Sequence, residues 1–127
     1  MQFRNNQITL GKNFDTFAPL GPCLATPDEL DAGLDVELRT FVNGEPRQCA
    51  RTSTMLFDVP TLISRISHVC TLEVGDIIST GTPAGVGAFR SPPLFLQVGD
   101  VVRMEIDGIG AIENRVVADS DFGESAG

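Results

Sequence analysis

The sequence is poor in residues that many metal, redox and membrane proteins use. It has one histidine (His68), one lysine (Lys12), three cysteines, and neither tryptophan nor tyrosine. An odd number of widely spaced cysteines favours neither a disulfide framework nor a zinc site, and it fits a reducing compartment. Apolar runs last only a handful of residues, so no membrane span is predicted. The first six residues lack the pattern of a secretory signal, so we expect a cytoplasmic protein, or a mitochondrial matrix protein if a presequence was lost.

Basic side chains are also scarce. Nine of them stand against 17 acidic ones, which gives a formal net charge of −8. Because no basic stripe offsets this charge, binding to nucleic acid is disfavoured. A length of 127 residues with 42% hydrophobic content predicts one domain with a real core. We expect that domain to cover residues 1–118, followed by an acidic, disordered tail over 119–127.

The sequence predicts a mainly β fold with one helix, which belongs to the α+β class. Apolar and polar residues alternate from Leu34, and Asn43-Gly44 supplies a two-residue turn before the chain returns over 45–51. A second hairpin is predicted over 101–117, around Asp107-Gly108. Thirteen glycines and eight prolines are consistent with many turns.

One apolar stripe predicts a helix over 58–70, with Asp58 as its N-cap and the stripe facing the core. The stripe consists of Val59, Leu62, Ile63, Ile66, Val69 and Cys70. His68 lies on the opposite side, which favours a structural role for the histidine. The sequence has no Gly-x-Ser-x-Gly elbow, so serine or cysteine hydrolase chemistry is disfavoured.

Three pairs of carboxylates stand two residues apart, a spacing that puts both members on one face of a strand. The pairs are Asp35/Glu37, Glu105/Asp107 and Asp119/Asp121. Each pair could hold a divalent metal. The alternation of the flanking residues favours the other interpretation, in which the first two pairs belong to solvated strand faces and the third to the tail.

Two further features suggest binding of an anion. The glycine-rich loop over 81–87 has the wrong spacing and context for a nucleotide loop, but its backbone N–H groups and the Thr82 hydroxyl suit a carboxylate. Lys12 lies in a polar, punctuated segment. It is either an ordinary solvated lysine or a cation that neutralises a developing oxyanion.

Several segments resemble, in order and spacing, those of the fumarylacetoacetate hydrolase family. The matching segments are 11–22, 42–45, 71–78, 80–87, 98–102 and 113–117. Segment 87–96 is similar to the branch that includes oxaloacetate tautomerases. The resemblance implies a mixed β-sandwich roll, usually in a homodimer, that binds Mg²⁺ or Mn²⁺ and acts on 2-oxo or 2,4-dioxo acids by hydrolysis, decarboxylation or tautomerisation.

The resemblance also implies roles for individual residues. Lys12 corresponds to the family's active-site lysine and Thr82 to the threonine of its glycine-rich loop. Gly81 beside it contacts the substrate carboxylate, Gln2 matches a glutamine that lines the site, and Thr16 matches a threonine near the metal's hydration shell.

The family's metal ligands, a Glu-x-Glu pair and an aspartate, all lie before the equivalent of Gln2. We therefore expect this chain to be a fragment, the C-terminal portion of the domain, with no metal ligand of its own and with exposed sheet edges. Two hypotheses follow from the sequence. The intact protein is a metal-dependent hydrolase or tautomerase, or the chain is an inactive family member that binds a partner or nothing.

Overall fold

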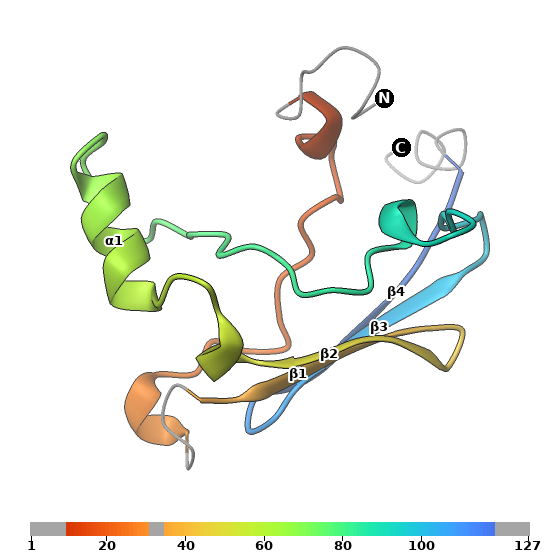
Figure 1. The fold of residues 1–127 in the computed structure, drawn as a ribbon, viewed down its shortest axis with the longest axis horizontal. Coiled ribbons are helices and arrows are strands. Elements are labelled where there is room, and N and C mark those ends of the chain that lie inside the picture. The colour runs from red at the N-terminus through yellow and green to blue at the C-terminus, as the bar shows by residue number, and fades with distance from the viewer. Residues whose placement is uncertain (1–9, 31–34, 119–127) are drawn as a thin grey trace, which may run out of the picture.

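The computed structural model describes residues 10–30 and 35–118, and its centre is a four-stranded antiparallel sheet (Figure 1). The strands are β1 (Glu37–Val42), β2 (Glu45–Arg51), β3 (Val101–Ile106) and β4 (Gly110–Arg115). Their order in the sheet is β2-β1-β3-β4, so the two predicted hairpins lie side by side and pair through β1 and β3. The predicted disordered tail lies outside the described residues.

Both hairpin turns follow the predicted residues. Asn43 and Gly44 have φ angles of 53° and 79°, as a two-residue turn of this kind requires, and Gly108 has a φ of 78°. The register of β1 and β2 shifts at Thr40, which pairs with Gln48, while the next residue Phe41 pairs with Pro46. This bulge gives β2 one extra residue and changes the direction of the side chains around it.

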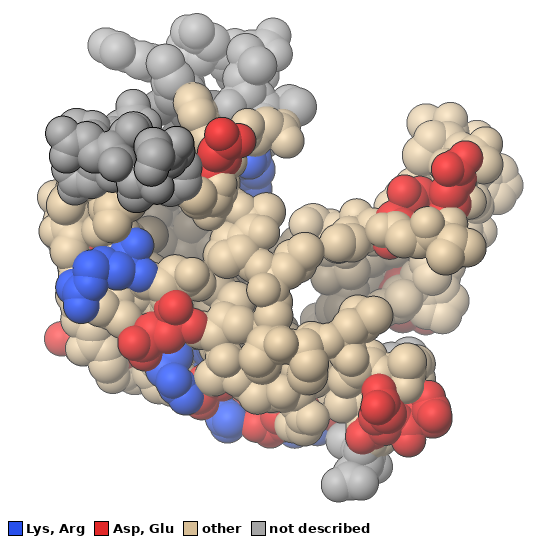
Figure 2. All heavy atoms as spheres, turned by 180° about the vertical axis from the view of Figure 1, so that it is seen from behind, with Lys and Arg blue, Asp and Glu red and all other residues tan. Residues whose placement is uncertain are grey.

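The two faces of the sheet differ in chemistry as the alternation predicts. The inner face carries mostly apolar side chains, among them Leu38, Val42, Val102, Met104 and Ile112. The outer face carries interleaved acidic and basic side chains, which are visible along the lower edge of the molecule in Figure 2. Most of these charges are paired with one another.

The helix α1 (Val59–Ser67) forms where it is predicted and is shorter by three residues at its carboxyl end. The Asp58 carboxylate accepts a hydrogen bond from the Thr61 backbone N–H at 2.9 Å, which caps the helix. The predicted burial of the apolar stripe is wrong for the described structure. No residue of α1 is buried, and Val69 is 88% exposed. Figure 1 shows the reason, since α1 stands apart from the sheet.

The expectation of a full core is likewise not met within the described residues. Val36, at 8% exposure, is the only buried hydrophobic residue there, whereas Leu56 is 90% exposed. A sheet needs a second layer to bury its apolar face. Among residues 10–30 and 35–118 no second sheet covers that face, and Figure 2 shows a deep hollow beside the segment that carries α1. None of the described helices is long and apolar enough to cross a membrane.

Four short 3₁₀ helices interrupt the loops of the described part of the chain. They are η1 (Leu10–Lys12), η2 (Pro27–Glu29), η3 (Thr52–Thr54) and η4 (Gly87–Phe89). The glycine-rich loop runs past the edge strand β2 and then leads into η4. Its residues therefore lie within hydrogen-bonding distance of β2.

Candidate active site

One side-chain amide of β2, that of Gln48, bonds the glycine-rich loop at two points. Nε2 of Gln48 donates hydrogen bonds to Oγ1 of Thr82 and to the carbonyl oxygen of Pro83, both at 2.9 Å. Gln48 is half-buried on the inner face of the sheet, whereas Thr82 is exposed. The loop can turn at this point because Gly81 has a φ of +110°, a conformation that favours glycine. The Thr82 hydroxyl is therefore anchored and still accessible.

Gly81 and Thr82 line a cavity of about 550 Å³. Its other walls come from β2, from the segment around η3 and from Leu62 of α1. Most of these walls are apolar. Thr82 is one of the few polar residues that line the cavity, and a mainly apolar lining with a few polar groups is typical of small-molecule sites.

The second half of the loop packs directly on the backbone of β2. Gly85 lies so close that a Cβ there would overlap the Arg47 carbonyl oxygen and stand 3.0 Å from Cγ of Gln48. The Arg90 guanidinium reinforces the contact, because Nη2 donates to the same carbonyl at 3.2 Å and Nε donates to the Gly85 carbonyl at 3.4 Å. Loop and strand thus form one unit.

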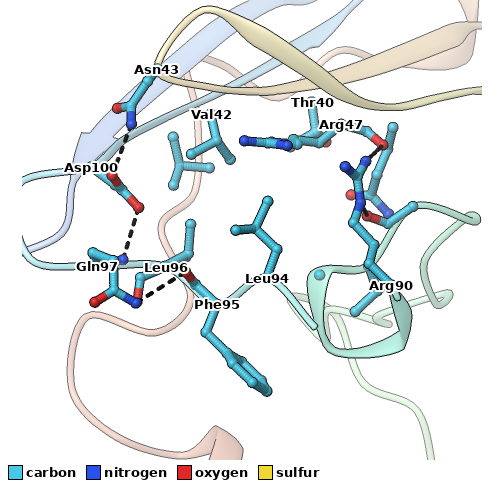
Figure 3. A pocket seen from close by; sticks show the side chains of 15 residues that line it. Thr40, Val42, Asn43, Arg47, Arg90, Leu94, Phe95, Leu96, Gln97 and Asp100 are labelled. Atoms are coloured by element: carbon cyan, nitrogen blue, oxygen red, sulfur yellow. Dashed lines mark hydrogen bonds between the residues drawn. The ribbon is translucent and has the colours of Figure 1, made fainter. Parts of the chain in front are cut away.

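A second cavity, of about 380 Å³, lies between the inner face of the sheet and the segment that follows the loop (Figure 3). Leu94 points from that segment toward Val42. Asp100 accepts hydrogen bonds from the side chain of Asn43 and from the backbone N–H of Gln97, both at 2.8 Å. These two bonds, with the Gln97 bond the larger cause, hold the pKa of the Asp100 carboxyl below its ordinary value. At this end of the cavity the polar groups of Asn43, Gln97 and Asp100 therefore bind one another.

The residues singled out from the sequence lie in two regions of the structure. Gly81 and Thr82 share the larger cavity. Lys12 ends η1 and Thr16 follows it with a φ of 66°, and both are exposed in a segment that does not line that cavity. Gln2 lies outside the described residues. The assignment of these five residues to one site stays a prediction.

The carboxylates of the first two pairs form ion pairs with arginines. The Arg39 guanidinium contacts Glu37 at 2.8 Å, Asp107 at 2.6 Å and Glu105 at 3.4 Å. A hydrogen bond from Arg103, helped by the charges of both arginines, lowers the pKa of the Glu105 carboxyl. This supports the interpretation of these pairs as strand faces and not as ligands.

The other carboxylate of the first pair, Asp35, is also bonded to protein groups. Asp35 accepts hydrogen bonds from the Ser53 backbone N–H and from Arg51, both at 3.1 Å, and its pKa is lowered mainly by Ser53. Asp119/Asp121 lie outside the described residues. Over 10–30 and 35–118, no group of three His, Cys, Asp or Glu side chains could hold a metal ion. The described residues therefore do not fit the Mg²⁺ or Mn²⁺ that the resemblance implies.

His68 bonds to its own helix. The ring atom Nδ1 lies 2.6 Å from the Ser64 carbonyl oxygen, so that nitrogen carries the proton and donates. The side chain is exposed at the C-cap of α1. This contact supports the structural role predicted for the histidine.

Gln48 is the residue that sequence reasoning missed. The signal available was a polar residue on the mostly apolar inner face of the predicted hairpin. Its partner Thr82 stands 34 residues further along the chain, and no local pattern joins them.

Comparison with known proteins identifies the class to which this fold and loop belong. The family model described as fumarylacetoacetate (FAA) hydrolase C-terminal matches residues 1–117, and the chain belongs to this family. The prediction of the family is confirmed, and so is that of a mainly β fold with one helix.

Individual relatives narrow the comparison. The chain is 50% identical over 117 residues to oxaloacetate tautomerase fahd2, mitochondrial, of Xenopus laevis, covering 92% of this chain and 37% of that protein. A fumarylacetoacetate hydrolase from Exiguobacterium antarcticum is 47% identical with a TM-score of 0.82, covering 91% of this chain and 43% of that one.

A third relative bears on the metal. A maleylpyruvate hydrolase from Sphingobium sp. SYK-6, solved with manganese(II) and pyruvate, is 39% identical with a TM-score of 0.71, covering 82% of this chain and 37% of that one. The chain thus spans less than half the length of each of these relatives.

Proposed function

We propose that this chain is the part of a 2-oxo acid enzyme that corresponds to the family's C-terminal model, and that the enzyme interconverts the keto and enol forms of oxaloacetate. The observation that carries the proposal is the 50% identity, over 92% of this chain, to a protein named oxaloacetate tautomerase. The cavity lined by Gly81 and Thr82 supports it, since the cavity offers donors for an anion. The alternative reaction is hydrolysis of a 2,4-dioxo acid, because other relatives are named as hydrolases.

Each proposed residue has a role that follows from its chemistry. The Thr82 hydroxyl and the backbone N–H groups beside Gly81 bind a carboxylate of the substrate. The Lys12 ammonium neutralises the negative charge that develops on the keto oxygen as a proton leaves the neighbouring carbon. Gln2 and Thr16 complete the lining of the site in this proposal.

A divalent metal belongs to the proposal for the intact domain, on the strength of the manganese(II) complex of the Sphingobium relative. Such an ion, when bound, supplies a Lewis acid for the keto oxygen. Its ligands would have to come from outside the described residues, because those residues provide no suitable group. We further propose that the intact protein is a homodimer with no nucleic-acid or membrane partner. The name of the Xenopus relative supports the matrix alternative for its location.

The second candidate is an inactive family member that binds a protein partner. Two observations on the described residues favour it, namely the lack of a metal-ligand group and the burial of a single hydrophobic residue. A chain with so much exposed apolar surface needs something to cover it.

A chimera tests the first candidate against the second. Residues 1–117 of this chain replace the matched segment of the Xenopus tautomerase, and enol-to-keto conversion of oxaloacetate is followed by ultraviolet absorbance. We expect an active chimera. Lys12→Ala should lower its rate by about 10²–10³, as expected for loss of one positioned electrostatic group. His68→Ala, the control, should leave the rate within about twofold because the hydrogen bond of His68 is made to its own helix.

Two results would contradict the proposal. A folded chimera with no activity toward any 2-oxo acid would favour the inactive candidate, and an unchanged rate in Lys12→Ala would remove Lys12 from the site. Calorimetric titration of the 127-residue chain with Mg²⁺ and Mn²⁺ checks the metal separately. We expect weak binding, and tight binding at one site would show that this chain supplies the ligands itself.

A further inference from the structure

The two hydrogen bonds of Gln48 determine which way its amide faces. The carbonyl oxygen of Pro83 can only accept a hydrogen bond, so the amide atom 2.9 Å from it must be nitrogen and not oxygen. The same nitrogen lies 2.9 Å from Oγ1 of Thr82. An NH₂ group has two hydrogens, and each of them has one acceptor here.

This orientation in turn determines the role of the Thr82 hydroxyl. Amide nitrogen donates and does not accept, so Oγ1 of Thr82 must accept from Gln48. The hydrogen of the hydroxyl cannot point to Gln48 and is left for another acceptor. Because Thr82 is exposed and lines the cavity of about 550 Å³, that acceptor can come from a bound molecule. A hydroxyl that donates suits a carboxylate, which only accepts.

We propose that Gln48 is a positioning residue that holds the Thr82 hydroxyl as a hydrogen-bond donor to the carboxylate of a 2-oxo acid. This inference rests on the proposed function, because it takes Thr82 as the group that binds the substrate. Gln48 itself does not touch the substrate in this arrangement. It acts by setting the direction of one hydrogen.

The surroundings of Gln48 hold its side chain in place. The bulge in β2 places Gln48 beside Arg47 on the inner face of the sheet, opposite Thr40 of β1. The Arg47 carbonyl accepts from Arg90, and Gly85 packs against both Arg47 and Gln48. The loop therefore cannot move away from Gln48 without breaking several contacts, which is the rigidity that a positioned donor requires.

Nuclear magnetic resonance of the full 127-residue chain tests the geometry without any assay of activity. Both side-chain N–H protons of Gln48 should resonate downfield and exchange slowly with solvent. Thr82→Val should shift one of the two and leave the other, which bonds Pro83. Rapid exchange of both protons, as in a solvated glutamine, would overturn the proposal.

Kinetics in the Xenopus chimera test the role toward substrate. Gln48→Ala should raise KM for oxaloacetate about 10- to 100-fold, the effect expected for one hydrogen bond to a charged group, with a smaller effect on kcat. Gln48→Glu should raise KM at least as much, because its carboxylate accepts the hydrogen of Thr82. In a Thr82→Val background Gln48→Ala should change KM less than about threefold, since Gln48 then has nothing to position.

Gln97→Ala is the matched control. The Gln97 amide donates to the loop carbonyls of Phe95 and Leu96 and to no part of the glycine-rich loop in these two bonds, so KM should stay within about twofold. If the effects of Gln48→Ala and Thr82→Val on KM are additive in an active chimera, the positioning role of Gln48 is overturned. The proposed function is then unaffected. An inactive chimera whose Gln48 protons are protected would overturn the proposed function and with it the role toward substrate.

Discussion

Replacement of Gly85 by alanine should detach the glycine-rich loop from β2. Two separate effects act at this position. The φ of Gly85 is +108°, which strains any residue with a Cβ, and the added Cβ would also overlap the Arg47 carbonyl oxygen. Gly75 separates the two effects, because its φ is +100° and nothing lies within 4 Å of a Cβ built there. Gly75→Ala is thus a control for backbone strain alone.

The magnitude follows from the hydrogen bonds that the overlap would break. Strain from an unfavourable φ costs about 1–3 kcal/mol and applies to both variants. Relief of the overlap moves the loop by about 1 Å, and the two 2.9 Å bonds of Gln48 then exceed about 3.5 Å and are lost. Each lost bond contributes about 0.5–1.5 kcal/mol. Gly85→Ala should therefore lower the free energy of unfolding by about 1–3 kcal/mol more than Gly75→Ala does.

Urea unfolding, followed by far-ultraviolet circular dichroism, measures the two free energies. The side-chain N–H resonances of Gln48 report on the loop independently. They should lose protection in Gly85→Ala and keep it in Gly75→Ala. Equal destabilisation of the two variants, with the Gln48 resonances protected in both, would refute the packing argument.

Two further predictions concern charge. Arg39→Met leaves three carboxylates without their shared cation, so the urea midpoint should fall at neutral pH and low salt. In 1 M salt the repulsion between the carboxylates is screened, and the midpoint should recover. An equal loss at both salt concentrations would contradict this prediction. Hydrogen bonds from Thr61 and from Gln97 lower the pKa of Asp58 and of Asp100, respectively. Their stabilising effect is complete above about pH 4, the ordinary aspartate value, and is lost as the pH falls through the lower folded-state pKa. Acid titration by circular dichroism should show this loss in the wild type, and a smaller loss in Asp58→Asn, which still caps the helix.

Local chemistry explains why the secondary structure could be predicted. Asn43-Gly44 supplies the positive φ angles of the first turn. Asp58 marks the start of α1 because its carboxylate satisfies a backbone N–H that the helix leaves free. The glycine-rich loop could be located for a similar reason, since its residues differ from their surroundings in composition.

Burial could not be predicted in the same way. The apolar stripe of α1 indicates which face a neighbour would cover, but the pattern cannot supply the neighbour. Ile63, within that stripe, is 44% exposed because only distant segments could cover it and none of the described ones does. The ion pair of Arg39 with Asp107 shows the same limit, since its partners are 68 residues apart and meet only when β1 pairs with β3.

The sequence by itself determined the family, the two hairpins, the helix and the position of the glycine-rich loop, because each depends on residues that are close together in the chain. Only the tertiary structure decided that the loop lies on β2 and that Gln48 donates to Thr82. A hydrogen bond has a direction, and the direction here depends on which atoms two segments 34 residues apart bring together. The scarcity of lysine and histidine pointed to Lys12 and His68, yet the structure adds a glutamine, a residue that composition does not single out.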